Sequence, residues 1–174
     1  MHRTMILIEP TIQVRFGRAL RRRALAAFLK QASEAARLNG DVAVLLTTDA
    51  RLRRLNREFR GKDRPTDVLS FPALLPLTQA LNGHRPAAGD LAISVETAAR
   101  QARAHDHPLA MELEILVLHG LLHLAGYDHE TDKGRMARKE AALRRRFGLA
   151  QSLIERSAKP APKKKASPHG GGKP

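Results

Sequence analysis

The 174-residue chain contains no cysteine, no tryptophan and a single tyrosine. The absence of cysteine excludes disulfides, thiolate metal ligands and cysteine nucleophiles. Any metal ion must therefore be held by histidine, aspartate or glutamate. Five phenylalanines and one tyrosine provide few of the aromatic platforms on which single-strand binders stack bases. If the chain binds nucleic acid, contacts with phosphate and recognition of shape should dominate.

Long hydrophobic runs are also missing. The apolar run near the N-terminus spans only Met5 to Ile8, which is too short for the core of a signal peptide. The longest apolar stretch, Ile115 to Ala125, includes two histidines, whereas a membrane span needs about 20 apolar residues. We therefore expect a soluble, cytoplasmic protein with no membrane partner.

Acidic residues are few compared with basic ones, 17 against 31, which gives a net charge of +14. Residues 156–174 hold six cations and no acid, so residues 1–155 keep 25 basic residues against 17 acidic ones, or +8. The positive charge is therefore not confined to the C-terminal end. It favours a polyanionic partner such as nucleic acid.

Composition divides the chain into two parts. Residues 1–154 are long enough and apolar enough to form one domain around a hydrophobic core. Residues 155–174 are rich in lysine, proline, alanine and glycine, cannot bury apolar surface, and are predicted to form a disordered basic tail.

The spacing of apolar residues predicts both strands and helices, and therefore an α+β domain. Strands are predicted over residues 5–16, with a break at Pro10, and over 41–47, 68–71 and 90–94. Helices are predicted over residues 18–38 and 95–105. Three more helices are predicted: from a cap at Asp49 to about Phe59, from Pro108 to about Ala125, and from a cap at Asp132 to Phe147. Residues 72–88 are predicted to be a long loop. The helix before Gly126 is apolar nearly all round and should be central and buried.

Three histidines lie within the segment HGLLHLAGYDH, residues 119–129. His119 and His123 are one helical turn apart and face the same way. Gly126 can end the helix in a left-handed conformation and turn the chain back, so that His129 approaches the other two. Three imidazoles around a tetrahedral ion leave one position for water, as in catalytic zinc sites. The segment therefore predicts one metal ion per chain, zinc or another divalent transition metal such as nickel.

The histidine spacing equals that of zinc proteases with the pattern HExxHxxGxxH, but Gly120 stands where those proteases have their glutamate. That glutamate is their general base. Its absence argues against peptide hydrolysis by the same mechanism, and we expect Gly120 to leave free space beside the metal. The sequence leaves the general base unassigned.

HGLLHLAGYDH resembles the signature of the YbeY family, bacterial metal-dependent endoribonucleases of ribosomal RNA maturation. Further blocks resemble that family: LNREFRGKDRPTDVLSFP at 55–72, GDLAIS at 89–94 and MARKE at 136–140. The resemblance covers roughly residues 5–150. It implies a single domain with a mixed four-stranded sheet packed with helices, and a metal site at one end of a long central helix.

The resemblance also implies cleavage of single-stranded RNA, in the maturation of small-subunit ribosomal RNA and in ribosome quality control. It assigns the metal ligands to His119, His123 and His129, and a catalytic role at the phosphate to Arg60, in a polar segment with Lys62 and Arg64. The expected partners are RNA, the small ribosomal subunit and ribosome-assembly factors, with neither DNA nor membrane. The alternatives are a non-catalytic RNA-binding assembly factor with a structural metal, and a metalloprotease.

Other polar residues are assigned weaker roles. Asp67 is interpreted as a cap or turn residue and Met136 as core filling, while Asp128 is placed next to the ligands, where it could orient an imidazole. The remaining histidines have no partner by spacing and are interpreted as surface residues: His2, His84, His105, His107 and His169.

Overall fold

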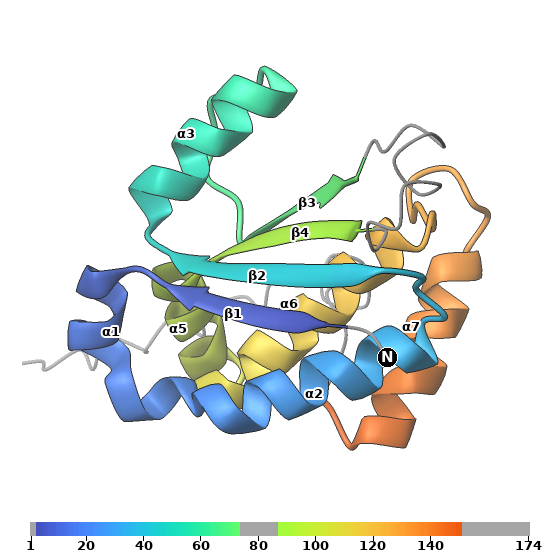
Figure 1. Cartoon of the computed structure of the whole chain (residues 1–174), viewed down its shortest axis with the longest axis horizontal. Coiled ribbons are helices and arrows are strands. Elements are labelled where there is room, and N and C mark those ends of the chain that lie inside the picture. The colour runs from blue at the N-terminus through green and yellow to red at the C-terminus, as the bar shows by residue number, and fades with distance from the viewer. Residues whose placement is uncertain (1–2, 74–86, 151–174) are drawn as a thin grey trace, which may run out of the picture.

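The computed structural model describes residues 3–73 and 87–150 (Figure 1). The predicted tail, 155–174, and most of the predicted loop, 74–86, lie outside the described residues, as do His2, His84 and His169. The described residues form one α+β unit, as predicted. Within them, no helix is long and apolar enough to cross a membrane.

A mixed sheet of four strands forms the centre, in the order β1-β2-β4-β3. Strands β1 (Thr4–Ile8), β2 (Asp41–Thr47) and β4 (Ala87–Ser94) are parallel, and β3 (Val68–Pro72) runs antiparallel along β4 with Ser70 opposite Leu91. The sequence DVAVLLT of β2 alternates between half-buried and buried positions until its end, which is typical of a strand with unequally covered faces. The mixed four-stranded sheet is confirmed.

Most helices cover one face of this sheet. They are α1 (Pro10–Phe16), which continues into a 3-10 turn (Gly17–Leu20), α2 (Arg22–Ala35), α5 (Val95–Ala104) and α6 (Leu109–Leu124), with α7 (Arg135–Phe147) packed beside α6 and α2 (Figure 1). The main hydrophobic core lies between them and the sheet. Helix α6 is buried continuously from Glu112 to Leu122 apart from Glu114, so its predicted central position is confirmed.

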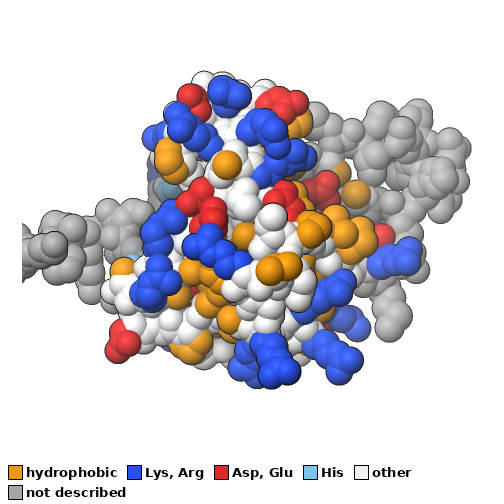
Figure 2. Space-filling model, turned by 90° about the vertical axis from the view of Figure 1, so that its left-hand side faces the viewer, with side chains coloured by type: hydrophobic (Ala, Val, Ile, Leu, Met, Phe, Trp, Pro, Cys, Tyr) orange, Lys and Arg blue, Asp and Glu red, His pale blue; other side chains and the backbone are white. Residues whose placement is uncertain are grey.

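Helix α3 (Asp49–Arg60) lies on the opposite face (Figure 1). Leu52 packs there on Leu69 and Ala92 in a second, smaller core. The outer side of α3 is strongly basic, and Figure 2 shows Lys and Arg side chains gathered at the top of the face in view, where this helix stands. Its exposed cations include Arg51, Arg53, Arg54 and Arg57.

The predicted strand over residues 5–16 is correct only up to Ile8. Pro10–Phe16 is a helix instead, with Pro10 in its first turn, where a proline costs nothing because the first amides of a helix have no internal partner. Ile12 is buried and Val14 is 88% exposed. The alternation of apolar residues there was compatible with a strand, but packing of the helix against the core decided the conformation.

Two predicted caps also differ. Thr48, not Asp49, caps α3 by accepting the Arg51 amide at 3.2 Å. Asp49 is the first helical residue, and its carboxylate accepts hydrogen bonds from Ser94 and Thr97 of the neighbouring segment. Asp132 lies before α7, yet its carboxylate accepts the Met136 amide at 2.7 Å. It therefore serves the first turn of α7 from outside the helix.

Candidate metal centre

His119, His123 and His129 come together at the C-terminal end of α6. Each offers a ring nitrogen, and these three atoms lie within 4.8 Å of one another. Gly126 has φ of 85° and directly follows the last turn of α6, a conformation that favours glycine. The chain reverses there, which brings the exposed His129 back beside the buried His119 and the half-buried His123. The structure thus brings together all three histidines that the sequence singled out.

The ring orientations suit a shared cation. The Nε2 atoms of His119 and His123 are 3.1 Å apart, close to the roughly 3.3 Å that separates two nitrogens on a tetrahedral ion with bonds of about 2.0–2.1 Å. Neutral imidazoles are needed for this. Burial, followed by the proximity of His119 and His129, lowers the pKa of His123 to about 4. The ring is therefore neutral near pH 7, and this set of donors fits a divalent transition metal.

The opposite ring nitrogens are held in place by other groups. His119 Nδ1 lies 3.4 Å from Glu140 Oε1 of α7, and this carboxylate is almost fully buried. The His123 ring bonds to the backbone of Tyr127; because its Nε2 faces His119, the nitrogen available for that bond is Nδ1. Partners of this kind fix the tautomer and the direction of a ligand ring.

Glu140 is not among the predicted site residues, although the sequence carries a signal for it. Met136, Glu140 and Leu143 are the buried residues of α7 and form one stripe at helical spacing. An acid on an otherwise apolar stripe requires a partner, because an unpaired buried charge is costly. The partner, His119, lies 21 residues earlier in the chain, so local spacing could not identify it.

We expect Glu140→Gln to weaken metal binding by about 10- to 100-fold, the usual cost of losing a partner of a ligand histidine. The amide keeps the size of the side chain but removes the charge that strengthens the bond to His119. Competition with a chelator of known affinity measures the effect. Glu58→Gln, on an exposed residue of α3 outside the metal site, is the matched control, and equal metal affinities for the two variants would contradict a role for Glu140.

Asp128 is hydrogen-bonded within its own turn, and among the described residues it makes no hydrogen bond to a histidine. Its carboxylate accepts the Glu130 amide at 3.1 Å and the Thr131 hydroxyl at 2.9 Å. The amide of Glu130, followed by the hydroxyl of Thr131, lowers the pKa of Asp128 below its usual value. Asp128 therefore stays ionised and shapes the turn that carries His129.

Gly120 corrects the prediction of free space beside the metal. A Cβ atom at this position would lie 2.7 Å from Leu91 Cδ2 and 3.3 Å from Ser70 Oγ, and the Ser70 hydroxyl donates to the Gly120 carbonyl at 3.3 Å. The glycine therefore permits close packing of α6 on β3 and β4. A glutamate here would point into the sheet, so the residue that serves as base in the zinc proteases has no room at this position.

We expect Gly120→Glu to destabilise the fold, because the side chain would be forced between α6 and the sheet. Overpacking typically costs about 1–3 kcal/mol, and an unpaired buried charge adds more. Urea unfolding of the metal-free protein measures the loss. Gly120→Ala, which gains about 1 kcal/mol of helix propensity against its own clash, should lose much less. If Gly120→Glu were as stable as the wild-type protein, this face of α6 would have to lie in solvent.

Arg60 lies at the C-terminal end of α3 rather than in a loop. Its Nη2 donates to the carbonyl of Ser70 in β3 at 3.2 Å. Arg60, Lys62 and Arg64 line a concavity of about 750 Å³, here called the metal concavity, whose wall also includes the three histidines. The structure thus brings the predicted cations and the predicted ligands to the same space.

The prediction for Asp67 agrees with the structure, whereas the prediction for His107 is wrong. Asp67 accepts the amide of Val68 at 2.8 Å and the side-chain amide of Gln101 at 2.9 Å, which agrees with a turn residue. His107, predicted to lie on the surface, has a side chain only 6% exposed, and its Nε2 is 2.5 Å from the buried carboxylate of Glu112. The two residues are five positions apart and are separated by Pro108, so helical spacing did not connect them.

Comparison with known proteins gives consistent matches over most of the chain. The family model described as Endoribonuclease YbeY matches residues 10–148. A protein named Endoribonuclease YbeY from Koribacter versatilis is 51% identical over 139 residues, which covers 80% of this chain and 86% of the relative. One from Solibacter usitatus is 47% identical over 146 residues, with coverage of 82% and 92%.

A solved structure is also similar. The solution structure of TM1509 from Thermotoga maritima has 26% sequence identity to this chain and a TM-score of 0.51. The match covers 95% of this chain and all of the other. The matched family region includes Arg60, the three histidines and Glu140.

Proposed function

This chain belongs to the Endoribonuclease YbeY family, and on that premise we propose that it is a metal-dependent endoribonuclease that cleaves single-stranded RNA. The observation that carries the proposal is the metal concavity, which is lined both by the three clustered histidines and by the cations Arg60, Lys62 and Arg64. A site for a divalent cation beside these positive side chains suits a phosphodiester, which carries a negative charge.

Each group of this site has a distinct task. The cations attract and orient the RNA backbone, because guanidinium and ammonium groups bind phosphate oxygens directly. Arg60 uses one of its five N–H donors on the Ser70 carbonyl, which holds the guanidinium in place and leaves other donors for phosphate. When bound at the histidines, a divalent ion supplies Lewis-acid chemistry and makes water more acidic. We propose zinc as this ion, with nickel as the alternative.

We place this activity in the cytoplasm, in the maturation of small-subunit ribosomal RNA, which is the role of the family. The net charge of +14 and the exposed cations of α3 support a large polyanionic partner. With the small subunit as the site of action, ribosome-assembly factors are the expected protein partners.

The deciding experiment is a nuclease assay on an internally labelled single-stranded RNA, with the same sequence as duplex RNA and as single-stranded DNA alongside. We expect cleavage of the single-stranded RNA alone, loss of cleavage with chelator, and recovery on adding zinc or nickel. If the protein bound RNA but did not cleave it with any added metal, the result would favour a non-catalytic assembly factor. Chelator-sensitive cleavage of unfolded casein would favour a metalloprotease.

A further inference from the structure

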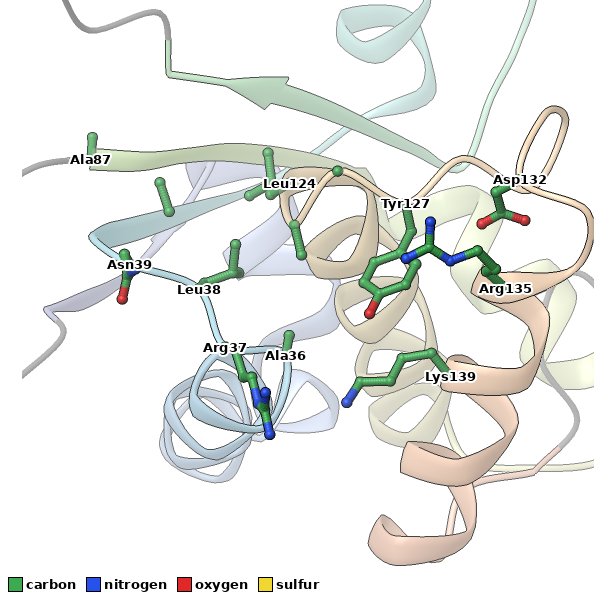
Figure 3. A pocket seen from close by; sticks show the side chains of 13 residues that line it. Ala36, Arg37, Leu38, Asn39, Ala87, Leu124, Tyr127, Asp132, Arg135 and Lys139 are labelled. Carbon is green, nitrogen blue, oxygen red and sulfur yellow. The ribbon is translucent and has the colours of Figure 1, made fainter. Parts of the chain in front are cut away.

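A second concavity, of about 560 Å³, adjoins the metal concavity. Gly126 and Tyr127 line both, so the turn that follows α6 forms a shared wall between them. The rest of the second concavity comes from the segment after α2, the start of β4, the end of α6 and the beginning of α7 (Figure 3). A chain molecule bound at the histidines could therefore continue across the turn into this space.

Three cations line this second concavity from two separate parts of the chain, and we call it the basic pocket (Figure 3). Arg37 follows the end of α2, while Arg135 and Lys139 lie one turn apart on α7. Arg37 has φ of 58°, a left-handed conformation that is uncommon for residues other than glycine.

Within the part of the chain that the structure describes, none of these three side chains forms an ion pair. Some exposed arginines do, such as Arg15 with Glu96 and Arg53 with Asp63, whereas Arg51 and Arg54 form none among the described residues. Like charges repel one another, and three cations against one acid leave the basic pocket with a net positive charge. A bound anion would relieve that repulsion.

The one acid on the wall does not neutralise the pocket. Asp132 directs its carboxylate to the Met136 amide at 2.7 Å and makes no ion pair with the three cations among the described residues. Three cations and one carboxylate line the basic pocket, so Asp132 offsets one of the three positive charges and two remain. Tyr127, the single tyrosine of the chain, contributes a hydroxyl group to the same space (Figure 3), and a phenol can donate a hydrogen bond to a phosphate oxygen.

We infer that the basic pocket binds a phosphodiester of the RNA strand whose neighbouring segment lies at the metal centre. The inference rests on the proposed function, because the same strand must occupy both concavities. The guanidinium groups of Arg37 and Arg135 can each make bidentate contacts with phosphate oxygens, and the ammonium group of Lys139 adds a point charge. The basic pocket thereby extends the RNA path past the reacting bond and favours longer strands over short ones.

The test compares the double variant Arg37→Gln/Lys139→Gln with the double variant Arg18→Gln/Arg145→Gln. Both remove two exposed or half-exposed cations, one pair inside the basic pocket and the other outside either concavity. Binding of single-stranded RNAs of increasing length is measured with full-length, metal-free protein in chelator, so that no cleavage occurs. Removal of one cation from a phosphate should reduce the salt dependence of log K by about 0.7, and removal of two by about 1.4.

We expect the pocket variant to show this weaker salt dependence and a lower affinity only for RNAs long enough to pass the Gly126 turn, while the control pair keeps wild-type behaviour. Equal binding by both double variants, or no RNA binding by wild type, would overturn the inference. Inorganic phosphate is the second probe: if the pocket variant no longer binds phosphate but binds RNA as wild type does, the pocket serves a free anion and the RNA inference fails. If length-dependent RNA binding disappears as expected but metal-loaded wild type never cleaves RNA, the proposed activity fails and the basic pocket stands.

Discussion

His123→Ala is expected to lose its metal ion and its RNA cleavage together. His123 provides one of three nitrogens on a buried framework, and two imidazoles do not complete a catalytic ligand set. Wild-type protein should hold about one ion per chain, and the variant close to none. Because the Lewis-acid contribution of such an ion is several kcal/mol, cleavage should fall on the order of 10³-fold or more.

Elemental analysis after gel filtration measures the metal content, and cleavage of single-stranded RNA measures the activity. His105→Ala is the matched control, since that histidine is exposed and lies before α6, outside the metal concavity. Circular dichroism should show the same helix content for both variants. Full metal occupancy in His123→Ala would mean that the clustered histidines do not form the metal site.

Arg60→Ala is the second large effect, with cleavage lower by about 10²–10³-fold, equivalent to about 2.7–4 kcal/mol. A charge aimed at the reacting phosphate contributes most in the transition state, so cleavage should fall further than RNA binding. Metal content should stay at the wild-type level, because guanidinium is not a metal ligand. Arg60→Lys should recover only part of the rate, since an ammonium group cannot make the bidentate contact with phosphate that a guanidinium group makes.

Single-turnover cleavage of a short single-stranded RNA by metal-loaded protein measures this effect. The hydrogen bond from Arg60 to Ser70 requires a stability control, because its removal could shift β3. A Tm within a few degrees of wild type separates a chemical role from a structural one, as a typical hydrogen bond contributes only about 1 kcal/mol. If Arg60→Ala cleaves within a few-fold of wild type, the catalytic charge comes from elsewhere in the metal concavity.

The clustering of the three histidines was predictable because its geometry is local. His119 and His123 share one helix face and Gly126 supplies the reversal that brings His129 back, so the sequence spacing determines most of the arrangement. Helix α6 was equally clear, since an apolar run of its length has few alternatives to a buried helix. The family resemblance added Arg60, which spacing alone could not connect to residues about 60 positions later.

The errors fall where contacts between distant segments decide the outcome. Residues 10–16 follow a pattern that suits a strand, yet the burial of Ile12 against the core selects a helix. The role of Gly120 depends on Leu91 and Ser70, which belong to strands far from it in sequence. The same holds for Glu140, whose partner is on α6. His107 was predicted to be exposed because its buried partner on α6, Glu112, was not recognised.

The three histidines differ in burial and in how the chain holds them, and we expect this difference to set how an ion enters and leaves. His119 and His123 are anchored by the most buried helix among the described residues, whereas His129 follows Gly126 in an exposed turn held by Asp128. Opening that turn requires breaking only local contacts, at far lower cost than global unfolding. The chain can therefore complete folding before it captures an ion. Metal exchange should proceed on the folded protein. Its rate should change with substitutions in the turn and should not follow the denaturant midpoint of global unfolding.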